Sequence, residues 1–174
     1  FMKLLEGSEK DEAIRWMEEA AIMARQSLCH NRKCGTVIIA DGEIIGRGYN
    51  APCLDKEENR RCNQDLGPAK PNFDKTCCMH AEWRAITDAM KKNPQKLSGS
   101  TLYFTSVDDE GKIKLSGEPS CTTCSRMSLD AGVATFVLWQ ERGMAAYPTD
   151  EYDRVSYEYV LSEKDKEKYR NLKL

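Results

Sequence analysis

The sequence has few histidines, no long hydrophobic run and almost no excess of charge. None of its apolar runs approaches the ~18 residues that a membrane-spanning helix needs, so we expect no membrane partner. The 26 basic and 28 acidic side chains leave a formal net charge of −2, which argues against a protein held on nucleic acid by phosphate neutralisation. No signal peptide follows Phe1-Met2, and we therefore expect a cytoplasmic protein.

The scarcity of histidine contrasts with an abundance of cysteine. His30 and His80 stand in a chain with eight cysteines. Without an export signal, cysteines favour metal or thiol chemistry over disulfides. Any metal site must then consist mostly of thiolates. The length of 174 residues predicts one domain, residues 1–174, large enough to bury a core of its own.

Helical and strand-like patterns alternate along the chain. We expect helices over residues 9–29, 78–92, 120–131 and 163–174, and strands over 36–40, 43–49, 101–107, 133–139 and 155–161. Ser8 and Asp11 resemble a capping box, and Asp41-Gly42 is typical of a hairpin turn. The first two strands are then antiparallel and the later ones are joined through helices. This predicts an α/β fold, a three-layer α/β/α sandwich around a mixed five-stranded sheet.

Two segments interrupt this pattern. Residues 51–77 are polar, contain prolines, and hold three of the eight cysteines, with Cys78 directly after them. A loop of this length is uncommon in a compact domain unless it is functional or disordered. Residues 108–118 form a second, shorter polar excursion. We interpret both as insertions into a single domain.

Two short motifs carry the chemistry: His80-Ala81-Glu82, and Cys121-Thr122-Thr123-Cys124. Cysteines three apart at a helix start lie on one side of the helix. The positive end of the helix also favours the thiolate form, which binds metal. One imidazole and two thiolates make three protein ligands, and an open fourth position is typical of a catalytic zinc. Taken without the His80 motif, the two cysteines are also typical of a thiol–disulfide pair or of part of a structural zinc site.

Glu82 lies two residues after His80. This spacing does not place two side chains on one face of a helix, so Glu82 is poorly placed as a further ligand. We predict instead that it acts on the water that the metal activates. His-x-Glu followed by Pro-Cys-x-x-Cys is the signature of zinc deaminases. Here Ser120 separates Pro119 from Cys121, and we expect Ser120 to cap the helix that follows.

Over roughly residues 10–140 the chain resembles the cytidine deaminase-like superfamily, most closely the deoxycytidylate deaminases. The segments that carry the resemblance are Cys34-Gly35-Thr36-Val37-Ile38, Gly48-Tyr49-Asn50, His80-Ala81-Glu82-Trp83-Arg84-Ala85-Ile86, Thr101-Leu102-Tyr103-Phe104-Thr105, Pro119 to Cys124, and Ala131-Gly132-Val133. The resemblance implies a cytidine deaminase-like fold and a zinc-dependent hydrolytic deaminase of a cytosine-type nucleotide or nucleoside, with dCMP converted to dUMP and ammonia. It also implies that Glu82 is catalytic, and that a homo-oligomer forms.

The resemblance further implies contacts with substrate. They come from Asn50, to the sugar or base, and from the backbone of Ala81 and Ser120, which would line the base. Arg84 stands where deoxycytidylate deaminases usually carry asparagine. Its guanidinium would serve phosphate recognition or face solvent. Lys91, near the end of the same helix, is a second candidate for phosphate contact.

Some deoxycytidylate deaminases carry a second, structural zinc near the long insertion. By position, the resemblance implies that its ligands here are Cys29, Cys62 and Cys78. The fourth ligand is left open among Cys77, Cys53 and His30.

Two other functions are compatible with these residues. One is deamination of another base, either a purine base or nucleoside or adenosine in transfer RNA. The other is a zinc-stabilised binding module without activity. An intact Glu82 and a three-ligand metal set argue against the second alternative.

Overall fold

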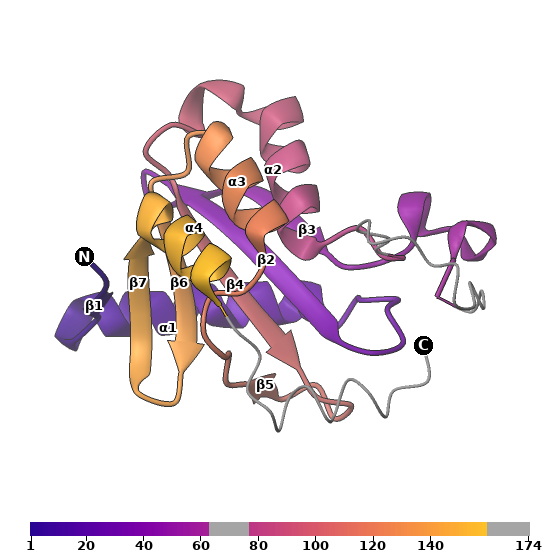
Figure 1. The fold of residues 1–174 in the computed structure, drawn as a ribbon, viewed down its shortest axis with the longest axis horizontal. Helices are drawn as coiled ribbons and strands as arrows, with labels where there is room; N and C mark the ends of the chain where they lie inside the picture. The colour runs from indigo at the N-terminus through magenta and orange to yellow at the C-terminus, as the bar shows by residue number, and fades with distance from the viewer. Residues whose placement is uncertain (63–76, 160–174) are drawn as a thin grey trace.

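The computed structural model describes residues 1–62 and 77–159, and these form three layers (Figure 1). A central sheet carries helix α1 on one face and the remaining α-helices on the other. The α-helices are α1 (Gly7–Ala24), α2 (Ala81–Lys92), α3 (Thr122–Asp130) and α4 (Thr149–Glu158). The predicted α/β/α sandwich is confirmed. No helix among the described residues is long and apolar enough to cross a membrane.

Within the described residues the sheet has seven strands, where the sequence predicted five. They are β1 (Lys3–Leu4), β2 (Lys33–Ala40), β3 (Glu43–Tyr49), β4 (Thr101–Val107), β5 (Ile113–Lys114), β6 (Thr135–Gln140) and β7 (Gly143–Pro148). Their order is β1-β7-β6-β4-β2-β3, with β5 beside β4. Strands β4 and β6 are parallel and the other pairs are antiparallel. The sheet is therefore mixed, as predicted.

The extra strands lie where the sequence shows little strand pattern. β7 contains Met144-Ala145-Ala146, which lacks the β-branched residues that mark a strand. The strand predicted over residues 155–161 is wrong, because its described part lies in α4, which follows Pro148 and carries Asp150 and Glu151 in its first turn. Apolar residues of α4 pack onto the sheet, and this packing outweighs a short alternating pattern. The helix predicted over 163–174 lies outside the described residues.

The first helix and hairpin test two local predictions. α1 begins at Gly7, with Glu6 as its N-cap and no capping bond from a side chain. Ser8 therefore lies inside the helix, and the predicted capping box is wrong. The turn at Asp41-Gly42 is confirmed: both residues have positive φ, 53° and 73°, as the tight turn between β2 and β3 requires.

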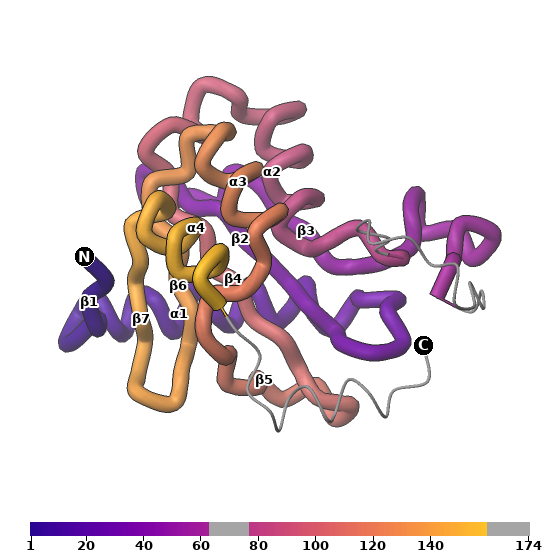
Figure 2. The backbone as a smooth tube through the Cα atoms, viewed as in Figure 1, coloured from indigo at the N-terminus to yellow at the C-terminus, as the bar shows by residue number. Residues whose placement is uncertain are grey.

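A close contact between β3 and α2 fixes the start of α2 on the sheet. A Cβ atom at Gly48 would stand 2.2 Å from the carbonyl oxygen of Ala81, and one at Gly46 would stand 2.3 Å from that of Ala85. Glycine at both positions lets the helix backbone approach the strand. α2 and α3 lie side by side on this face of the sheet (Figure 2).

Candidate metal centre and substrate cavity

The first turns of α2 and α3 carry the two sequence motifs. His80 is the N-cap of α2. Cys121, not Ser120, is the N-cap of α3, and its Sγ accepts a hydrogen bond from the backbone N–H of Cys124 at 3.3 Å. The predicted Ser120 cap is therefore wrong, and α3 starts one residue after Cys121.

The three predicted ligands converge at these helix ends. Nδ1 of His80 lies 3.0 Å from Sγ of Cys124 and 3.5 Å from Sγ of Cys121. The two sulfurs are 2.7 Å apart. Within the described ranges, this is the one group of three potential ligands whose donor atoms all lie within 4.8 Å of one another. The group comprises one imidazole nitrogen and two thiol sulfurs, a donor set that fits zinc.

The electrostatics of the cluster also favour a cation. A hydrogen bond from the thiol of Cys124, reinforced by His80, lowers the pKa of Cys121 from 9.0 to about 4. Burial raises the pKa of Cys124. A thiolate beside a buried thiol gains a counter-charge when a metal binds, and the metal displaces the remaining proton.

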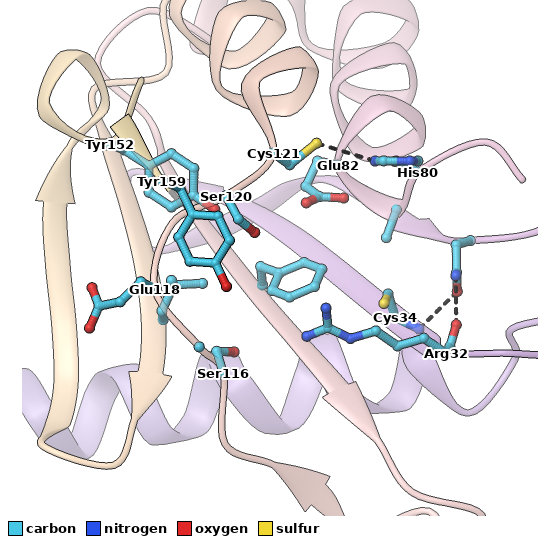
Figure 3. Close-up of a pocket in the computed structure, with 15 residues that line it drawn as sticks. Arg32, Cys34, His80, Glu82, Ser116, Glu118, Ser120, Cys121, Tyr152 and Tyr159 are labelled. Atoms are coloured by element: carbon cyan, nitrogen blue, oxygen red, sulfur yellow. Dashed lines mark hydrogen bonds between the residues drawn. The ribbon is translucent and has the colours of Figure 1, made fainter. Parts of the chain in front are cut away.

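Glu82 lies beside the cluster without belonging to it. Its side chain is 5% exposed, and burial raises the pKa of its carboxyl group. The carboxylate lies between Cys121 and the cavity below it (Figure 3). Glu82 is thus a buried acid that lines both the metal-ligand cluster and the cavity.

The cavity beside the cluster has a volume of about 340 Å³, within the range of small-molecule sites. His80, Glu82 and Cys121 line one end. The predicted substrate contacts Asn50, Ala81 and Ser120 line the same cavity. Sequence and structure therefore agree on which segments meet here.

The side-chain amide of Asn50 is already engaged by the protein. Its oxygen accepts from Ser27 Oγ at 2.6 Å and from the backbone N–H of Cys34 at 2.8 Å. Its nitrogen donates to the carbonyl oxygen of Arg32 at 2.7 Å. Asn50 therefore holds the segment that leads into β2 against the wall of the cavity.

The sequence analysis missed several residues that line the cavity. Arg32 extends into it from the segment before β2, and Ser116 and Tyr159 lie at the same end (Figure 3). Tyr152 of α4 forms part of the wall and stacks on Phe136. No pattern in the sequence marks these positions, because they come from three separate segments that only the fold brings together: the residues before β2, the residues after β5, and α4 with its C-terminal end.

The guanidinium of Arg32 brings a positive charge to the cavity. Its guanidinium makes no hydrogen bond or ion pair with any other described residue, and it lies 5.5 Å from the centre of the Phe104 ring. Ser116 Oγ is buried and has no hydrogen-bond partner in the described part of the chain. A cation and an unpaired hydroxyl at one end of a cavity are suited to an anionic group.

The two basic candidates on α2 lie elsewhere. Arg84 donates to Asp55 Oδ1 at 2.7 Å and to the carbonyl oxygen of Pro52 at 2.9 Å. Arg84 and Lys91 line a separate cavity of about 510 Å³ on the β3 side of α2. Neither residue lines the cavity next to Glu82.

Four of the other cysteines, Cys29, Cys62, Cys77 and Cys78, lie around the end of the insertion. Burial, followed by a contact with Cys29 and one with Cys77, raises the pKa of Cys78. Cys77 also contacts Cys62, and its Sγ accepts from the backbone N–H of Arg61 at 3.1 Å. Cys29 thus contacts Cys78 directly, and Cys62 is linked to Cys78 through Cys77. The sulfurs of Cys29, Cys62 and Cys78 do not all lie within 4.8 Å of one another.

Comparison with known proteins matches most of the chain to one family. Residues 10–140 match the model of the cytidine and deoxycytidylate deaminase zinc-binding region. The deoxycytidylate deaminase of Schizosaccharomyces pombe is 32% identical over 79 residues, which cover 42% of this chain and 24% of that protein. The match thus spans about a quarter of the length of that curated relative.

The fold also matches solved structures. The dCMP deaminase from the cyanophage S-TIM5, in complex with dCMP and dUMP, has a TM-score of 0.52 and 22% identity, over 76% of this chain and 82% of that chain. The cytidine deaminase from Burkholderia pseudomallei has a TM-score of 0.53 and 14% identity, over 80% and 94%. At these identities the similarity concerns the fold.

Proposed function

Since the chain belongs to the cytidine and deoxycytidylate deaminase zinc-binding family, we propose that it is a zinc-dependent hydrolytic deaminase that converts dCMP to dUMP and ammonia. The observation that carries this proposal is the convergence of His80, Cys121 and Cys124 next to a buried carboxylate in a cavity. Three protein ligands are typical of a catalytic rather than a structural zinc.

The residues divide the chemistry between them. His80, Cys121 and Cys124 would hold the zinc, which when bound supplies the activation of water for nucleophilic attack. Glu82 takes a proton from the attacking water and delivers it to the ring nitrogen next to the carbon under attack. Glu82 then takes a second proton, from the hydroxyl group that has been added to this carbon, and gives it to the amine, which leaves as ammonia while the carbonyl forms. A carboxyl group with a raised pKa suits this exchange, since it can both accept and return the proton.

The far end of the cavity supports a nucleotide rather than a nucleoside. A base held near Glu82 would direct its sugar and phosphate away from the metal cluster, toward Arg32 and Ser116. A phosphate there would receive hydrogen bonds from the guanidinium of Arg32 and from the hydroxyl of Ser116, which lacks a hydrogen-bond partner among the described residues. The backbone of Ala81 and Ser120 would contact the base, and Asn50 the sugar or base.

Replacing Arg32 with Gln tests the phosphate contact. A charged hydrogen bond contributes about 1.5–3 kcal/mol, so kcat/KM for dCMP should fall about 10- to 100-fold. Deamination of deoxycytidine should change little. The measurement is ammonia release, and the matched control is Lys33→Gln, whose lysine pairs with Asp109. Equal losses of kcat/KM for dCMP and for deoxycytidine would show that Arg32 does not contact the phosphate. The proposal that the protein is a deaminase would not be affected by that result.

The same ammonia assay, run over bases, nucleosides, monophosphates and RNA, separates the alternative functions. Ammonia release from a purine or from adenosine in transfer RNA, and not from dCMP, would identify that compound as the substrate in place of dCMP. Release from none of them, together with a fourth protein ligand on the metal, would identify a binding module. The proposal also includes a cytoplasmic location, and assembly into a homo-oligomer that the family resemblance alone supports.

We also propose that Cys29, Cys62 and Cys78 hold a second, structural zinc. The contacts of Cys77 with Cys62 and Cys78 favour Cys77 as the fourth ligand, ahead of Cys53 and His30. Four thiolates form a closed structural site. Because Cys78 lies two residues before His80, a metal ion bound here would also stabilise the segment that leads into α2.

Metal analysis tests the second site. Protein never exposed to chelator should contain two zinc ions per chain, and Cys78→Ser should contain one. Cys53→Ser should keep two, because Cys53 lies on the surface outside the thiol contacts. Finding no more than one zinc in the unaltered protein would refute the second site.

A further inference from the structure

The imidazole of His80 lies flat against the indole of Trp83. Their ring centroids are 4.2 Å apart, and the planes differ by 5°. His80 is the N-cap of α2 and Trp83 stands in its first turn, and positions three apart on a helix are neighbours. The pair is therefore built into the same helix end that carries Glu82.

Other roles for Trp83 find no support in the structure. The residue does not line the cavity next to Glu82. Its indole Nε1–H is buried and has no hydrogen-bond partner among the residues that the structure describes. The stacking contact with His80 thus places this side chain next to the candidate metal centre.

We propose that Trp83 is a positioning residue that holds the imidazole of His80 with Nδ1 directed at Cys121 and Cys124. Rotation of the imidazole about its Cβ–Cγ bond would turn the ring edge-on into the indole. Because the indole lies parallel to the imidazole and stacked on it, this rotation requires the helix end or the indole to move first. The inference rests on the proposed metal centre.

Positioning of this kind changes the affinity of the centre for its metal ion, and it affects turnover only through that change. A ligand already held in its binding orientation loses less freedom when the metal binds. Groups that orient a metal-ligating histidine typically change metal affinity by 10–100-fold. A flat ring contact provides no hydrogen bond, so we place its effect at the lower end, about tenfold.

The test is the rate at which zinc passes from the intact protein to a chromophoric chelator. Trp83→Leu and Trp83→Met should release the zinc of the Cys121–Cys124 centre about tenfold faster than the unaltered protein. Trp83→Phe, which keeps a flat ring, should stay within about threefold of the unaltered protein. Trp139→Leu is the matched control, because Trp139 is half-buried on the α1 face of the sheet, and its release rate should be unchanged.

Two measurements separate positioning from a loss of folding. The Cys124→Ser variant identifies which phase of zinc release belongs to this centre. Cobalt(II) in place of zinc should show a changed visible absorption in Trp83→Met but not in Trp83→Phe, at comparable melting temperatures. Zinc release and cobalt spectra like those of the unaltered protein in both Trp83→Leu and Trp83→Met would overturn the inference. Neither readout needs a substrate, so failure of the dCMP assignment leaves this result standing.

Discussion

Glu82→Gln should lower kcat for dCMP by about 10²–10⁴-fold while zinc content stays unchanged. Glutamine has nearly the size of glutamate, so the buried position, 5% exposed, is still filled. What it lacks is a carboxylate that can take a proton from water and return it to the base. The measurements are ammonia release under saturating substrate and zinc per chain.

Asp88→Asn is the matched control for this variant. Asp88 lies on the same helix, accepts a hydrogen bond from the backbone N–H of Arg47 and pairs with Lys92. It lies outside the cavity that contains Glu82, so kcat should change less than about twofold. If Glu82→Gln retains activity comparable to that of Asp88→Asn, the proton-transfer role of Glu82 is wrong.

Cys124→Ser should remove one zinc ion per chain and abolish measurable deamination. Cys124 is fully buried, and its Sγ lies within 3.0 Å of both other ligands of the centre. A serine hydroxyl is a poor zinc ligand because it remains protonated near neutral pH, whereas the metal requires a deprotonated donor. With two ligands left, the centre should lose the ion.

Zinc analysis and the ammonia assay check this result together. Cys53→Ser serves as the control, since Cys53 is exposed and should affect neither zinc content nor turnover. A Cys124→Ser protein with full zinc content and normal turnover would show that the metal is bound elsewhere. Loss of exactly one ion would also show that the two proposed zinc sites fill independently.

The cluster of His80, Cys121 and Cys124 could be predicted from the sequence because its signals are local. Cysteines three apart at a helix start lie on one side of the helix whatever the rest of the fold does. The hairpin at Asp41-Gly42 likewise depends on two residues that adopt positive φ. A short strand of small residues such as β7 has no local signal of this kind. The end of α4 has none either, because its apolar and polar residues alternate as they do in a strand.

The sequence alone was thus enough to single out His80, Cys121 and Cys124, which the fold brings together, and the layered α/β architecture. The surroundings of this cluster follow from the packing of the whole chain. The close approach that Gly48 allows sets α2 on the sheet, and Arg32 and Tyr159, distant in sequence, meet in one cavity. Ligand types follow from the chemistry of neighbouring residues, whereas the shape and charge of a cavity depend on packing between segments that no local pattern relates.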